Sequence, residues 1–130
     1  MTDTPRYIKK YFVIVSIIAF ILGLVLYFTP STLLNLFMDT PMSNKNLYFP
    51  RFIGTTLFAF GYLNYWASSQ NLTIIRNVAI VNIMSLLPAT LLSFSAYFFP
   101  MIDRNRWLLC LEHTLILLGF TATMYLLKQD

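Results

Sequence analysis

Charged residues are scarce in this chain of 130 residues. Asp, Glu, Lys and Arg make up 11% of it, whereas soluble domains contain roughly 25%. Hydrophobic residues make up 58%, and a soluble domain of this size buries too little of its surface to hide them. The scarcity of charge therefore excludes an ordinary soluble fold and favours a chain that is surrounded by lipid.

Cysteine, histidine and basic clusters are also nearly absent. The single cysteine, Cys110, has no second cysteine for an intrachain disulfide, and we expect a small buried apolar side chain there. One histidine completes neither a zinc set nor a pair of haem ligands, so we expect no cofactor. The net charge of +4 is spread over loops and chain ends, which argues against nucleic acid as a partner.

What the sequence does contain is four long apolar stretches. A membrane-spanning helix needs about 20 mostly apolar residues, and the stretches cover residues 9–29, 50–67, 74–99 and 105–127. We predict an all-α fold, a single transmembrane domain over residues 1–130 that forms a four-helix antiparallel bundle, because short loops make consecutive helices neighbours. Residues 31–38, which follow Pro30, are too few to cross and should form a short interfacial helix.

The flanks of the spans give an orientation. The apolar part of the first stretch exceeds the roughly 7–15 residues of a signal peptide, so we expect it to be a retained span. Aromatic residues, Tyr11 among them, collect near the span ends as in an interfacial belt. With both termini cytoplasmic, as we predict for a bacterial inner membrane, five basic residues lie inside and four outside. The inner set is Arg6, Lys9, Lys10, Arg76 and Lys128, and the outer set is Lys45, Arg51, Arg104 and Arg106.

Small and polar residues recur at helical spacing within each span. Such residues let helices approach closely in lipid, so these stripes should face one another. The stripes are Ser16, Ala19 and Gly23; Arg51, Gly54, Thr55 and Gly61; Asn82, Ser85, Ala89, Ser93 and Ala96; and Glu112, Gly119 and Thr123.

Glu112 and His113 form the candidate site, because both lie inside the last span. A carboxylate there costs roughly 2–3 kcal/mol at mid-membrane, so it needs a partner. Arg51 starts from the same side of the membrane, which predicts an Arg51–Glu112 pair, or a polar network that these two share with Ser93 and His113. Such a contact would fix the helix register or serve binding or proton handling; alternatively, Arg51 lies among lipid headgroups.

A second polar group is expected to join the helices near the opposite side. It comprises Tyr62, Asn64 and Tyr65 in the second span and Asn82 in the third. Asn82 lies deep enough to require an interhelical hydrogen bond. We interpret Asn82, Tyr62 and Asn64 as helix-packing residues.

Two segments carry a resemblance to known proteins: TPSTLLNLF at residues 29–37 and FPRFIGTTLFAFGYLNYWA at residues 49–67. They resemble small uncharacterised bacterial four-span membrane proteins, in which a proline-led segment follows the first span and Arg-x-x-Gly opens the second, here Arg51 to Gly54. A similar layout occurs in the eukaryotic four-span scaffold of sterol-synthesis enzymes. The resemblance implies a protein that holds partners together, and it transfers no catalytic residue.

Several functions fit these features. We favour an accessory subunit, assembly factor or scaffold that contacts other membrane proteins, or copies of itself, within the lipid bilayer. The alternative is an oligomeric transporter or channel subunit with its polar site around Glu112 and Arg51. An enzyme acting on lipid ranks lower, because neighbours such as Glu112 and His113 should point in different directions around a helix. An immunity protein against a pore-forming toxin fits by size alone.

Overall fold

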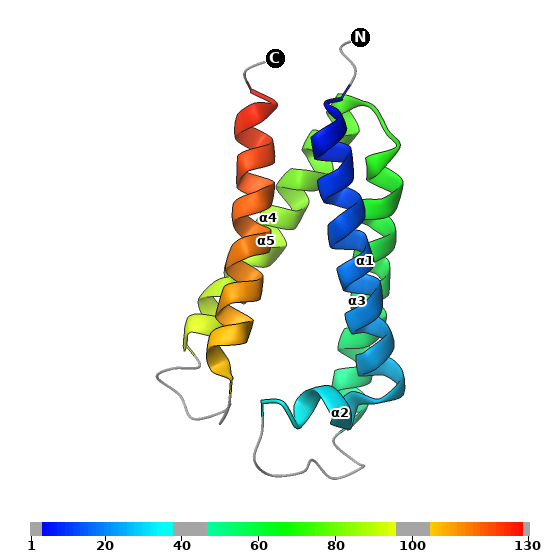
Figure 1. The fold of residues 1–130 in the computed structure, drawn as a ribbon, viewed down its shortest axis with the longest axis vertical. Helices are drawn as coiled ribbons and strands as arrows, with labels where there is room; N and C mark the ends of the chain where they lie inside the picture. Colours follow the sequence, from blue (N-terminus) through cyan, green and yellow to red (C-terminus); the bar gives the residue numbers. More distant parts are fainter. Residues whose placement is uncertain (1–3, 38–46, 96–104, 129–130) are drawn as a thin grey trace.

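The computed structural model describes residues 4–37, 47–95 and 105–128, which are helical with no β-strand among them. The helices are α1 (Arg6–Phe28), α2 (Pro30–Leu34), α3 (Tyr48–Ser68), α4 (Leu72–Ser95) and α5 (Arg106–Leu126). Along the chain the four long helices alternate in direction, and α2 lies across their lower end (Figure 1). The prediction of an all-α fold is confirmed.

The helix boundaries lie close to those expected. Helices α1 and α3 begin a few residues before the predicted spans, and α4 continues through Pro88 to Ser95. Residues 96–99 of the third predicted span and Met38 of the short segment lie outside the described residues. The turn between α3 and α4 is short because Asn71 Oδ1 accepts a hydrogen bond from the Ile74 N–H, 3.1 Å away, and so caps α4.

Three of the described helices are long and apolar enough to cross a membrane: α1, α4 and Trp107–Leu126 of α5. This indicates a membrane protein. Helix α3 is not among them although it has 21 residues, because Arg51, Asn64 and several hydroxyl residues interrupt its apolar sequence. Cys110 is buried, as expected.

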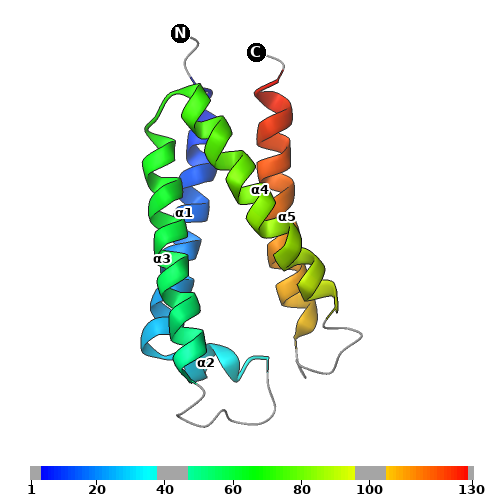
Figure 2. The ribbon, with the colours of Figure 1, turned by 180° about the vertical axis from the view of Figure 1, so that it is seen from behind.

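The long helices form two hairpins, α1 with α3 and α4 with α5. These two pairs make the most extensive helix–helix contacts, whereas α1 and α5 touch in few places. Seen from behind, α4 crosses from the end of α3 to lie along α5 (Figure 2). The hairpins meet near the chain termini and separate toward α2.

Glycine allows α1 and α3 to pack closely. A Cβ added to Gly54 would lie 2.9 Å from Gly23 O and 2.9 Å from Tyr27 N, which are both backbone atoms. Further along, a Cβ on Gly61 would lie 3.2 Å from Ser16 O. The predicted stripe of Ser16, Ala19 and Gly23 is buried and faces α3, whereas Thr55 of the second stripe and Ser85 of the third are exposed.

An aromatic cluster joins the hairpins at the end near the termini. The Phe120 ring of α5 packs edge-to-face on Tyr11 and Phe12 of α1, with ring centroids 5.1 and 5.4 Å apart. The Tyr11 hydroxyl donates to Ile116 O at 2.7 Å, and the Tyr11 ring covers Gly119. The prediction of an interfacial belt did not include this contact, in which the Tyr11 hydroxyl bonds a backbone acceptor on α5.

Replacing Gly54 with leucine should destabilise the α1–α3 hairpin. The new side chain meets backbone atoms that cannot rotate away, so we expect a loss of about 1–3 kcal/mol in the free energy of unfolding. Unfolding in SDS-containing mixed micelles measures this loss. Thr55→Leu, at an exposed neighbouring position, is the control and should change stability little; equal losses for both variants would contradict the packing argument.

Candidate functional site

Two apolar cavities lie between the hairpins and meet at Glu112 and His113. The outer cavity, about 490 Å³, is enclosed by α1, α3 and α5, and by Leu33 and Phe37 at the α2 end. The inner cavity, about 260 Å³, extends between all four long helices as far as Val15 and Ile116. Leu22, Leu57, Glu112 and His113 line both cavities, so we treat the two as one inter-hairpin cleft.

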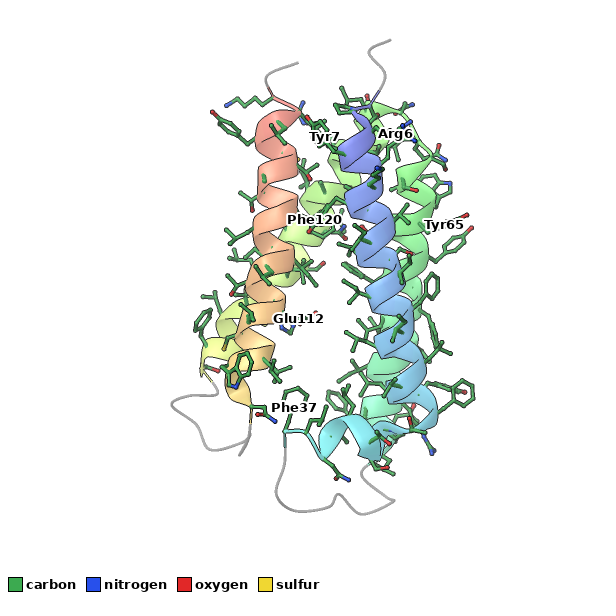
Figure 3. All side chains as sticks on the ribbon, viewed as in Figure 1. Arg6, Tyr7, Phe37, Tyr65, Glu112 and Phe120 are labelled. Carbon is green, nitrogen blue, oxygen red and sulfur yellow. The ribbon has the colours of Figure 1, made fainter. Side chains whose placement is uncertain are left out.

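Glu112 points from α5 into the space between α5 and α1, with Phe37 below it and Phe120 above (Figure 3). It lies six residues after Arg106, or roughly 9 Å along the helix axis. Its side chain keeps 38% of its surface exposed, and His113 keeps 24%. The cleft therefore presents a polar pair on an otherwise apolar surface.

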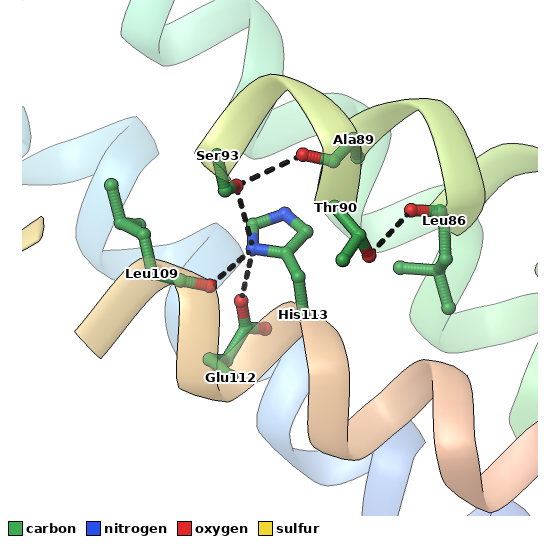
Figure 4. Close-up of polar contacts among 7 residues, drawn as sticks. All are labelled: Leu86, Ala89, Thr90, Ser93, Leu109, Glu112 and His113. Carbon is green, nitrogen blue, oxygen red and sulfur yellow. Dashed lines mark hydrogen bonds and ion pairs between the residues drawn. The ribbon is translucent and has the colours of Figure 1, made fainter. Parts of the chain in front are cut away.

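Glu112 and His113 contact each other directly. His113 Nδ1 lies 2.9 Å from Glu112 Oε2 and 2.9 Å from Leu109 O (Figure 4). The expectation that the two neighbours point in different directions is wrong, because rotation about their side-chain bonds brings both polar groups to the same side of α5.

These distances indicate which imidazole nitrogen carries a hydrogen. Both oxygens near Nδ1 are acceptors, so Nδ1 carries the hydrogen and donates it. In the neutral ring Nε2 then offers a lone pair. No contact is drawn for Nε2 among the residues of Figure 4. The free positions of the Glu112 carboxylate are therefore the acceptors that the pair offers in either state of the ring.

Ser93 connects this pair to α4. Its hydroxyl donates to Ala89 O at 2.9 Å, and its oxygen lies 3.4 Å from His113 Nδ1. Ser93, Glu112 and His113, three of the four residues of the predicted network, therefore lie together across the α4–α5 hairpin.

Arg51 is not part of this network. Its side chain is exposed at the start of α3, and within the described residues Glu112 contacts His113 instead. The predicted Arg51–Glu112 pair is thus wrong for this structure. Arg51 lies on α3 three residues before Gly54, which faces α1. The outer cavity, which Ile53 and Leu57 line on α3, lies between α3 and Glu112.

The second predicted polar group is formed by two of its members. Asn82 Nδ2 donates to Asn64 Oδ1 at 2.8 Å, and Asn64 Nδ2 donates to Phe60 O, so the expected interhelical bond of Asn82 is confirmed. Both asparagines are buried, and Asn82 Oδ1 has no partner among the described residues. Tyr62 does not pack between helices: it is 63% exposed, because it lies two residues, or about 200°, from Asn64.

Two of the structural contacts were not predicted from the sequence. Tyr11 bonds the α5 backbone, and Asn105, with φ of 50°, donates from Nδ2 to Leu36 O at 2.7 Å beside α2. The sequence features that could have indicated them are a tyrosine one residue before a deeply apolar run and an asparagine preceding a span. Within the described residues, no group of three or more His, Cys, Asp or Glu side chains is placed to hold a metal ion.

Comparisons with protein-family models, with curated proteins and with solved structures give no match. They therefore do not test the resemblance to bacterial four-span proteins or to the sterol-synthesis scaffold, and the site must be interpreted from its own geometry.

A double-mutant cycle distinguishes the two partners that Glu112 was expected to have. Glu112→Met and His113→Phe should be non-additive by about 0.5–3 kcal/mol, because the groups are in contact. Glu112→Met and Arg51→Ala should be additive within about 0.5 kcal/mol. Unfolding in mixed micelles measures both, and coupling to Arg51 instead of His113 would reject the network described here.

Proposed function

We propose that the chain crosses the membrane four times, with both termini on the cytoplasmic side of a bacterial inner membrane. The support comes from α3, which is nearly as long as α1 and packs closely along it through Gly54 and Gly61. A helix that runs beside a membrane-spanning helix over this length lies in the same layer of lipid. In lipid, its polar residues are acceptable where they face other helices, as Asn64 does.

Cysteine labelling tests this topology. In a Cys110→Ser background, single cysteines at Ser69 and Lys128 should react with an impermeant maleimide from the cytoplasmic side, and a cysteine at Ser31 from the opposite side. All three residues are exposed, so access does not depend on unfolding. Labelling of Ser31 and Ser69 from one side would show that α3 does not cross the membrane.

We propose further that the protein acts as an accessory subunit, assembly factor or scaffold, by binding a partner within the membrane. The inter-hairpin cleft is the observation that carries this proposal. Helices in lipid associate through close packing, so a cleft between two well-packed hairpins offers apolar walls that a bound partner would contact.

Transport is the second candidate, because the Glu112–His113 pair in the cleft is suited to proton handling. The ring contacts of Phe120 with Tyr11 and Phe12 oppose it in a single copy. They fill the end of the cleft, so a continuous pathway would require several copies of the chain.

Filling the cleft tests the binding function. Leu57 lines both cavities, so Leu57→Trp should remove whatever copurifies with the protein in mild detergent and reduce its amount at least tenfold. Leu118→Trp is the matched control, because Leu118 is 58% exposed and lies on the opposite face of α5. Mass spectrometry of the purified material, lipids included, gives the readout. An unchanged set of bound molecules in Leu57→Trp would refute binding in the cleft.

A further inference from the structure

We infer that the inter-hairpin cleft binds a single-chain amphiphile whose head group donates hydrogen bonds to Glu112, beside His113. This inference rests on the proposed binding function, since it names the occupant of the same cleft. Size, wall chemistry and the polar atoms at the junction of the two cavities each support it.

With the hairpins as they stand, the size of the cleft fits a small molecule, whereas a partner helix would fit only after the hairpins move apart. The cavities of about 490 and 260 Å³ are comparable with the roughly 300–1,000 Å³ of small-molecule sites. One turn of helix with its side chains fills about 400–600 Å³. A partner helix running along the cleft needs several times that volume, so the hairpins would have to move apart.

The walls are apolar almost throughout. Two hydroxyl residues, Thr56 and Ser85, also line the inner cavity, but each donates its hydrogen to its own helix, at Phe52 O and Val81 O. The ionisable side chains among the lining residues are Glu112 and His113. An occupant therefore has an apolar body and one polar group, located where the two cavities meet.

The acceptor at this junction is the carboxylate of Glu112. It has no hydrogen to give when ionised, and the Nδ1 proton of His113 is already directed to Glu112 and Leu109. What remains are the free lone pairs of the carboxylate. They select a donor such as an amine or a hydroxyl, and a protonated amine also neutralises the charge of Glu112. They disfavour a carboxylate head group.

Native mass spectrometry of the full chain, released from mild detergent, tests this selection with three probes of equal chain length: dodecylamine, dodecanol and laurate. Dodecylamine should bind at least tenfold more tightly than laurate, and dodecanol should lie between them. Glu112→Met should lower dodecylamine affinity about tenfold or more, and Leu57→Trp should abolish binding of all three. Leu118→Trp should bind as the unmodified chain does. Leu109→Trp fills the outer cavity from α5 and replaces Leu57→Trp if that variant does not fold.

Equal binding of laurate and dodecylamine, or dodecylamine binding that Glu112→Met leaves unchanged, would overturn the inference. A membrane protein that copurifies with the unmodified chain and is lost in Leu57→Trp, with none of the three probes bound, would also overturn it while leaving the proposed function intact. Failure of both experiments would remove the proposed function as well.

Discussion

The two hairpins are held together where Tyr11 of α1 meets α5. At this junction the hydroxyl reaches the backbone oxygen of Ile116, and the rings of Phe12 and Phe120 pack around it. The bond from Asn82 of α4 to Asn64 of α3 also links the hairpins in this half; toward α2 they separate, and Asn105 bonds Leu36 at the far end. The inter-hairpin cleft lies between the Tyr11 and Asn105 contacts, and it distinguishes this molecule from a closed four-helix bundle.

The position of Glu112 follows from this arrangement. It lies four residues before Ile116, about one helical turn from the junction, on the face of α5 that turns toward α1. Two turns further along α5 it would meet the Tyr11 ring, as Gly119 does. The carboxylate thus stands about one turn before Ile116, where the inner cavity ends, and His113 and Ser93 supply neighbours on the α4 side.

The sequence predicts well the features that depend on one helix face or on one buried polar side chain that needs a partner. The stripe of Ser16, Ala19 and Gly23 was found from spacing alone, because small residues on one face have few other uses in lipid. The Asn82 bond was expected because a buried amide must find a partner. The Arg51–Glu112 pair was not correctly predicted, because it required knowing how far the hairpins separate. That distance is set by the hydrogen bond of Tyr11 to Ile116 and by the ring contact of Tyr11 with Phe120. Each contact joins residues that are more than a hundred positions apart in the chain.

An ionisable pair in an apolar cleft has an energetic consequence for any occupant. A carboxylate such as Glu112 has a free-energy cost in lipid. The His113 contact offsets only part of this cost, because it bonds one oxygen and leaves 38% of the side chain exposed. A purely apolar occupant would bury the remaining lone pairs without partners and so raise that cost. An occupant with a donor group removes the cost while its chain fills the apolar walls. On the inference drawn above, Glu112 makes the cleft selective for such an occupant, and this selectivity requires that the hairpins stay apart while joined at the Tyr11 end.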